Sequence, residues 1–223
     1  MSIGKCVTIA SAVTFTLTTA VVALAGDGNR QKIRFNAADQ AAARAAVLRK
    51  SDLGSGTGWR GGARKPDLSA TESCPNYSPK QSDLVLTGAA ETQFSLGTLV
   101  FDSEAQVLET ARMVRLDWRR SVLAPGVLAC LRSTMSKSTP PGTRVLSIQK
   151  LAFPRVAQYT AAFRLVIDVR SSRATVRLLV DVALVGRGRT EIILTTSAPL
   201  AARVSVKAAE IRLARILVAR IRA

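Results

Sequence analysis

The sequence predicts an α+β domain in which an antiparallel sheet is covered by helices. Apolar and polar residues alternate between Ala161 and Leu184, which is the period of half-buried strands. Beyond Pro199, apolar residues recur on one arc of a helix that closes the chain. Since helical segments come before and after a run of strands, the order is typical of an antiparallel sheet with helical layers. We expect a C-terminal four-stranded meander together with an N-terminal strand pair.

The N-terminus is typical of a secretory signal peptide. Lys5 precedes an apolar run from Cys6 to Ala25, and the small residues that end this run fit the site that signal peptidase cleaves. We therefore expect cleavage between Ala25 and Gly26 and a secreted or extracytoplasmic protein. Because a run of about 20 apolar residues can also span a bilayer, a retained N-terminal membrane anchor is the alternative.

The rest of the chain is long enough for one domain with a sizeable core. We therefore expect a signal peptide over 1–25, a linker over 26–36 and a single secreted α+β domain over 37–223. The Ala-rich residues 37–50 predict a helix. Residues 54–80 are rich in Gly, Ser and Pro and predict a long loop.

Extended structure and two helices are expected in the middle of the chain. Residues 83–101 are predicted to be extended, with bends at Gly88 and Gly97. Ser103 and Gln106 fit a capping box, which predicts that a helix begins there. A second helix is expected over 126–137.

The second half of the chain predicts the meander. A strand over 143–152 precedes a hairpin whose turn is Ser172 and Arg173, and a further strand includes Ile192, Leu194 and Thr196. With that turn, Arg164 lies opposite Asp181 and Asp168 lies opposite Arg177. We predict two ion pairs on the outer side of the hairpin.

The composition excludes several kinds of catalysis. The chain has no histidine, which removes Ser-His-Asp catalysis, Cys-His catalysis and His-ligated zinc. Once Cys6 is lost with the signal peptide, two cysteines remain, which are too few for a four-cysteine zinc site. In an oxidising compartment we expect Cys74 and Cys130 to form one disulfide, with two free thiols as the alternative.

Three motif matches are better explained by structure than by catalysis. The glycines over 54–58 follow a predicted helix, whereas a phosphate-binding loop follows a strand. Ser147 and Lys150 match S-x-x-K, but the alternation of a strand puts them on opposite faces. The nearby carboxylate pairs are Asp102 with Glu104 and Asp83 with Glu91, and we expect capping, turns and solvation to account for them. We therefore expect no catalytic residue, no cofactor and no metal.

The charge favours anionic partners. The formal net charge is +17, which attracts anionic lipid headgroups or cell-wall polymers. The candidate anion-binding residues lie on the closing helix, at Arg212, Arg215, Arg220 and Arg222. The alternative is a helix that packs on the sheet with its arginines solvated. We do not expect nucleic acid as a partner, because the chain has few aromatic residues on which bases could stack.

Several short segments resemble secreted actinobacterial proteins. They are residues 45–53, which end in Ser51-Asp52-Leu53, then Gly58-Trp59, Cys74, Phe101-Asp102-Ser103-Glu104-Ala105 and Leu128-Ala129-Cys130-Leu131. The order of elements is similar to the PsbP-like fold and to extracellular sensor domains of the kind attached to bacterial receptor kinases. The resemblance implies a binding or accessory domain without catalytic residues.

These observations lead to three hypotheses about function. The first is a secreted, non-enzymatic domain that binds an unidentified ligand or protein partner at the cell envelope. The second is a basic surface protein that binds anionic membrane or cell-wall polymer. The third is a hydrolase that uses carboxylates. A deep apolar pocket would favour the first, a continuous basic face the second and two carboxyls facing one cleft the third.

Overall fold

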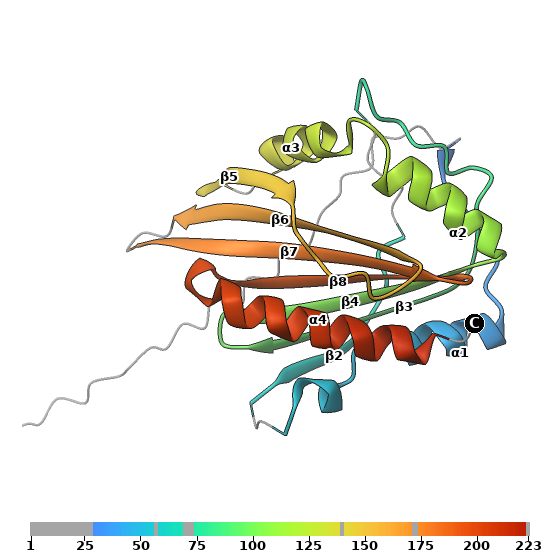
Figure 1. Cartoon of the computed structure of the whole chain (residues 1–223), viewed down its shortest axis with the longest axis horizontal. Helices are drawn as coiled ribbons and strands as arrows, with labels where there is room; N and C mark the ends of the chain where they lie inside the picture. Colours follow the sequence, from blue (N-terminus) through green and yellow to red (C-terminus); the bar gives the residue numbers. More distant parts are fainter. Residues whose placement is uncertain (1–28, 56–57, 69–73, 139–140, 171–173, 222–223) are drawn as a thin grey trace, which may run out of the picture.

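The protein folds around a single mixed sheet of eight strands with helices on both faces (Figure 1). The computed structural model describes residues 29–55, 58–68, 74–138, 141–170 and 174–221. The predicted signal peptide, its cleavage site at Ala25 and Gly26, the hairpin turn and Arg222 lie outside these residues. The α+β class is confirmed.

Seven of the strands follow the order β1-β3-β4-β8-β7-β6-β5, and β2 pairs with β3 off this path. Every pairing is antiparallel except that of β1 with β3. The strands are β1 (Lys32–Ile33), β2 (Arg60–Arg64), β3 (Val85–Leu96), β4 (Leu99–Leu108), β5 (Thr143–Lys150), β6 (Tyr159–Arg170), β7 (Thr175–Arg187) and β8 (Thr190–Pro199).

Four α-helices and three shorter helical turns complete the described part of the chain. The α-helices are α1 (Ala37–Ala46), α2 (Ala111–Asp117), α3 (Val127–Ser138) and α4 (Arg203–Arg220). The turns are η2 (Lys50–Leu53), the π-helical η3 (Trp118–Val122) and η4 (Leu200–Ala202).

The predicted meander β5-β6-β7-β8 is confirmed, and its register is the one that the sequence predicts. Arg164 lies opposite Asp181, and Asp168 lies opposite Arg177. Both ion pairs form, with an Nε–Oδ1 distance of 2.7 Å in each. The Arg164–Asp181 pair was expected on an outer face but is buried, and the Asp181 side chain is only 1% exposed. The reason is that helices cover both faces of this sheet, so that neither side of the hairpin is simply solvated.

Helices α1 and α4 cover what we call the first face of the sheet. Ala43 and Ala46 of α1 and Leu213 and Leu217 of α4 are almost completely buried in the main core. Gly88 of β3 allows α1 to come close, because a Cβ atom at this position would lie 2.3 Å from the carbonyl oxygen of Asp39. The tight contact fixes α1 against the sheet.

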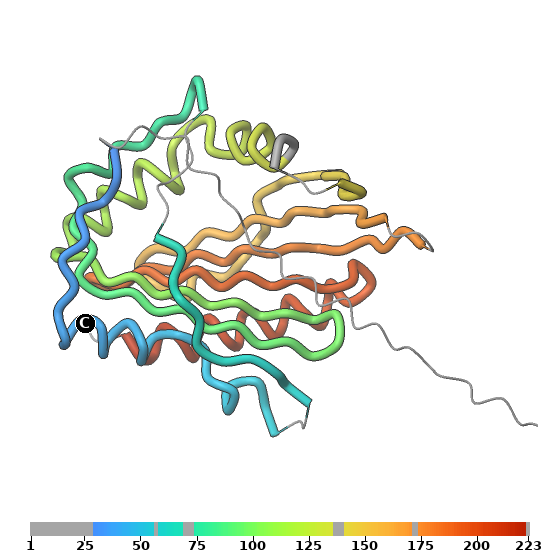
Figure 2. The backbone as a smooth tube through the Cα atoms, turned by 180° about the vertical axis from the view of Figure 1, so that it is seen from behind, coloured from blue at the N-terminus to red at the C-terminus, as the bar shows by residue number. Residues whose placement is uncertain are grey.

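Helices α2 and α3 lie against the opposite, second face. Val114 of α2 packs with Leu86 and Leu108, and α3 packs beside β5. Figure 2 shows that the segment after β2 runs across this face, where Leu68 joins the same cluster. The predicted disulfide between Cys74 and Cys130 is present and ties the segment before β3 to α3.

Three local predictions were wrong. Ser103 does not begin a helix but lies fully buried in β4, and α2 begins only at Ala111 with Thr110 as its N-cap. A capping box is a short local pattern, and the alternating burial along β4 overrides it. The loop predicted over 54–80 contains the edge strand β2, and the linker predicted over 26–36 contains β1. Both strands are short and polar, so that their apolar periodicity is weak.

Candidate functional site: the basic face of helix α4

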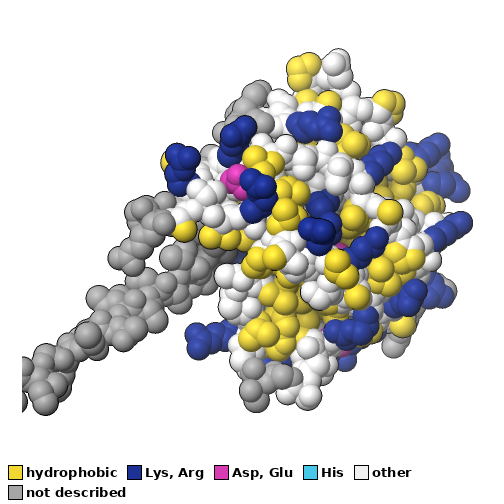
Figure 3. All heavy atoms as spheres, turned by 60° about the vertical axis from the view of Figure 1, so that its left-hand side comes forward, with side chains coloured by type: hydrophobic (Ala, Val, Ile, Leu, Met, Phe, Trp, Pro, Cys, Tyr) yellow, Lys and Arg dark blue, Asp and Glu magenta, His cyan; other side chains and the backbone are white. Residues whose placement is uncertain are grey.

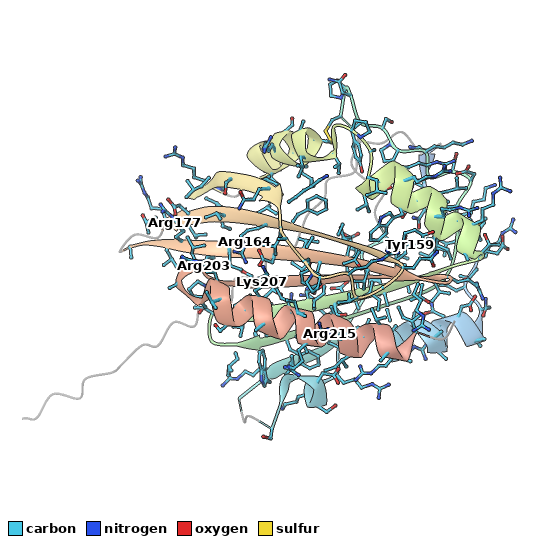
Figure 4. All side chains as sticks on the ribbon, in the orientation of Figure 1. Tyr159, Arg164, Arg177, Arg203, Lys207 and Arg215 are labelled. Atoms are coloured by element: carbon cyan, nitrogen blue, oxygen red, sulfur yellow. A yellow bond between two sulfur atoms is a disulfide. The ribbon has the colours of Figure 1, made fainter. Side chains whose placement is uncertain are left out.

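Three cations of α4 form what we call the basic face: Arg203, Lys207 and Arg215. Figure 4 shows these three side chains along α4, with Arg164 and Arg177 on the neighbouring strands β6 and β7. Arg203 and Arg215 are exposed and Lys207 is half-buried. Arg215 points away from the core because Val206, Leu213 and Leu217 hold the opposite side of the helix against the sheet.

Of the four arginines predicted to bind anions, the three that the structure describes divide between two roles. Arg212 donates a hydrogen bond from Nη1 to the carbonyl oxygen of Asp52 at 2.8 Å. Arg220 pairs with the Asp52 carboxylate, with an Nη1–Oδ2 distance of 2.9 Å, and also reaches the carbonyl oxygen of Val47. These two arginines therefore hold the segment after α1 against α4. Arg212 is nevertheless exposed, as Arg215 is.

Sequence reasoning missed Arg203 and Lys207. The signal was present only in part, because residues separated by four positions are neighbours on a helix. Arg203 and Lys207 have this spacing, whereas Arg215 is eight positions beyond Lys207.

Many acidic side chains in the described part of the chain are engaged with arginine, in buried or exposed ion pairs. Six of them form arginine ion pairs: Asp39–Arg189, Asp52–Arg220, Asp83–Arg120, Glu91–Arg64, Asp168–Arg177 and Asp181–Arg164. The exposed surface consequently shows far more Lys and Arg than Asp and Glu, as the space-filling view in Figure 3 shows for one face. The positive field of the protein is therefore opposed by few surface anions.

A row of carboxyl groups on the second face has raised pKa values. Burial and the neighbouring Glu91 raise the pKa of Asp102 to about 7. Burial also raises the pKa of Glu104 to about 7, against a hydrogen bond from Gln106 at 2.7 Å that stabilises the anion. Burial, together with the charge of Asp117, raises the pKa of Glu191 well above its ordinary value.

This row corrects the expectation that solvation accounts for Asp102 and Glu104. The register places Glu104 opposite Glu91 on β3, so that carboxyls from adjacent strands meet. Because neighbouring carboxylates oppose each other's ionisation, Asp102 and Glu104 are partly protonated near neutral pH. The protein then carries more positive charge than its formal value of +17.

Two further buried carboxyl groups, those of Glu210 and Asp181, lie beneath α4. Glu210 is 1% exposed, and burial, with the charge of Asp181 beside it, raises its pKa to about 8. The positive charge of Arg164 and the hydroxyl of Thr196 lower this pKa in part. Neither carboxyl oxygen of Glu210 makes a well-formed hydrogen bond to a described residue. Glu210 and Asp181 can share a proton, but both carboxyl groups are enclosed between α4 and the sheet.

The structure places the other candidate motifs apart from any common site. Ser147 pairs with Val166 and Lys150 with Phe163, so that the two side chains lie on opposite faces of β5, as predicted. Gly54 follows η2 and is succeeded by the strand β2, which is not the order of a phosphate-binding loop. Asp83 binds Arg120 in a bidentate pair, with an Nη1–Oδ1 distance of 2.7 Å and an Nη2–Oδ2 distance of 3.1 Å.

A groove of about 450 Å³ lies beside the first half of α4. Its lining includes Trp59 and Phe101, whose ring centroids are 5.7 Å apart, and Val206 and Ala209 of α4. Among the described residues that line it, Arg212 is the one that carries a charge. The groove is therefore mainly apolar with a single cation.

Comparison of the chain with protein-family models, with curated proteins and with solved structures found no match. Within the described ranges, no His, Cys, Asp and Glu side chains gather in a group that could hold a metal ion. None of the helices in the described part of the chain is both long enough and apolar enough to cross a membrane.

Proposed function

We propose that the protein is an extracytoplasmic, non-enzymatic binding domain that attaches to an anionic surface of the cell envelope, either membrane lipid or wall polymer. The basic face of α4 would make the contact. The observation that carries this proposal is the segregation of charge: most of the described acids are paired or buried, whereas Arg203 and Arg215 are exposed. Opposite charges attract such a surface without a shaped pocket.

The partner that this face favours is extended and anionic. Arg203, Lys207 and Arg215 follow one another along a helix of 18 residues, so that they form a row rather than a cluster. Arg164 and Arg177 lie nearby but are each paired with an aspartate, so that the cations of α4 carry the attraction. Each Lys or Arg near an anionic lipid surface contributes about 1 kcal/mol to binding.

The signal peptide at 1–25 and the PsbP-like or sensor-domain likeness belong to the same proposal. The apolar run from Cys6 to Ala25 supports export. The Cys74–Cys130 bridge fits the oxidising compartment that an exported protein would enter. An exported domain of this kind would meet anionic polymers and lipid headgroups.

The test is co-sedimentation of the disulfide-intact protein with vesicles and polymers. Phosphatidylglycerol vesicles and polyphosphate are compared with phosphatidylcholine vesicles, at low and high salt. We expect binding to the anionic targets at low salt and its loss at high salt, because salt screens exposed charges. Absence of binding to every anionic target at low salt would overturn the proposal.

A matched pair of triple variants locates the surface. Arg203, Lys207 and Arg215 are changed to Gln in one variant. The other changes the exposed arginines of α2 and η3, at Arg112, Arg115 and Arg119, and so removes the same charge from the opposite face. The α4 variant is expected to lose about 3 kcal/mol of binding free energy, or roughly a hundredfold in affinity. An equal loss in both variants would contradict the assignment to α4.

A further inference from the structure

The groove beside α4 has the features of a site for a small amphiphile. Its volume of about 450 Å³ lies within the range of ligand pockets, which is roughly 300–1,000 Å³. Trp59 and Phe101 are 8% and 3% exposed, so that a rigid aromatic pair underlies it. Such a lining favours a hydrocarbon chain, because burial of apolar area from water is favourable.

The charge at the groove has one sign. Arg212 lines it, and the only hydrogen bond described for this guanidinium goes to a neutral carbonyl oxygen, that of Asp52. The carboxylate of Asp52 is instead bound by Arg220 and by the backbone N–H of Arg49. None of the described residues that line the groove is acidic. The remaining donors of Arg212 are therefore suited to an anionic group at the end of an apolar chain.

The groove and the basic face are different sides of α4. The groove is lined by Ser205, Val206 and Ala209 of α4, together with Ala202 of η4, at spacings of three and four residues. Arg203, Lys207 and Arg215 do not line it. A ligand in the groove would therefore not need the cations that attract an extended polyanion.

From this geometry we infer that the groove binds the single chain of an anionic amphiphile, a fatty-acid-like carboxylate, with its tail against Trp59 and Phe101 and its headgroup at Arg212. The groove is accessible to the hydrocarbon chain of the ligand from its rim, where Leu96 is 42% exposed. This inference goes beyond the proposed attachment to polyanions and does not depend on it.

Tryptophan fluorescence reports on the site directly. The chain has two tryptophans, and Trp118 lies on the second face, where its ring stacks with Tyr159 at 5.4 Å. The variant Trp118→Phe leaves Trp59 as the only reporter, and Trp59→Phe leaves the distant one. Dodecanoate is titrated below its micelle concentration and at high salt, with calorimetry as a second measure of binding. We expect a saturable change from Trp59, none from Trp118, and a heat of binding that saturates at the same ligand concentration.

Variants separate groove binding from general adsorption. Arg212→Gln is expected to weaken dodecanoate binding about tenfold, and Arg212→Lys to restore part of it. Ser205→Phe fills the groove from an exposed position and should abolish binding, whereas Ala208→Phe adds the same ring to α4 outside the groove and should not. Dodecyltrimethylammonium should bind at least tenfold more weakly than dodecanoate.

Three outcomes would overturn this inference. One is the absence of saturable binding of dodecanoate by both fluorescence and calorimetry. Another is equal affinity for dodecanoate and dodecyltrimethylammonium. The third is binding that Ser205→Phe leaves intact. None of these results affects co-sedimentation with anionic vesicles at low salt, so that failure of the groove and failure of the basic face are distinguishable.

Discussion

Replacement of Glu210 by Gln should make the protein less sensitive to alkaline pH. Glu210 lies beneath α4 beside Asp181, and burial raises its pKa to about 8. The side chain is protonated in the folded protein below that pH, and a neutral Gln has nearly the same size and shape. We therefore expect Glu210→Gln to change the free energy of unfolding little at pH 5.

The magnitude follows from the difference between the folded and unfolded pKa values. The folded protein holds this proton more tightly than the unfolded chain, whose pKa is close to the ordinary value of 4.5. The stabilisation is complete below pH 4.5 and is lost as the pH rises through 8. One pKa unit corresponds to about 1.4 kcal/mol, so that between pH 5 and pH 8 the wild type should lose on the order of 4 kcal/mol relative to Glu210→Gln.

The assay is urea unfolding of both proteins at several pH values between 5 and 9, with oxidised cysteines. Only the difference between the two proteins is interpreted, because Asp102 and Glu104 also titrate near pH 7. Their contribution is common to both proteins and cancels. The variant should become the more stable protein as the pH rises. Two curves that remain parallel from pH 5 to pH 8 would refute the proposed protonation of Glu210.

Other changes test the packing and the covalent link. Replacement of Cys74 and Cys130 by Ser opens a bridge between residues separated by 56 positions and should cost about 4 kcal/mol, measured as the change in urea unfolding. Gly88→Ala should destabilise the protein by more than about 2 kcal/mol, because its Cβ atom would collide with the backbone of α1, whereas Gly62→Ala, with open space around it, should be tolerated. Equal thermal shifts for the two alanine variants would contradict this. Asp168→Asn breaks an exposed ion pair and should leave the melting temperature nearly unchanged.

The C-terminal half of the fold was predictable because its signals are long and mutually consistent. The hairpin of β6 and β7 matches both apolar residues and opposite charges across the strands, and a slip by one residue would break both matches. The closing helix buries several apolar residues at helical spacing, among them Val206, Leu213 and Leu217. Local patterns were less reliable, since Ser103 has the sequence of an N-cap but lies in a strand whose pairing involves residues far along the chain.

The candidate site was predictable only in part. The sequence predicted the helix that carries the cations. It could not show that Arg212 and Arg220 would both donate hydrogen bonds to Asp52. That contact joins residues far apart in the chain. The groove was not found either, because Trp59 meets Phe101 only once β2 and β4 are in the same sheet.

The pairing of β4 with β8 has a consequence for the order in which the chain folds. Phe101 is a neighbour of Thr196 in the sheet, so that the middle strand pair is complete only when a late segment arrives. The last turn of α4 is equally needed, because Leu217 is fully buried in the main core. Contacts of such long range make folding slow. A chain that is synthesised from its N-terminus therefore cannot acquire its native core until nearly all of it is available.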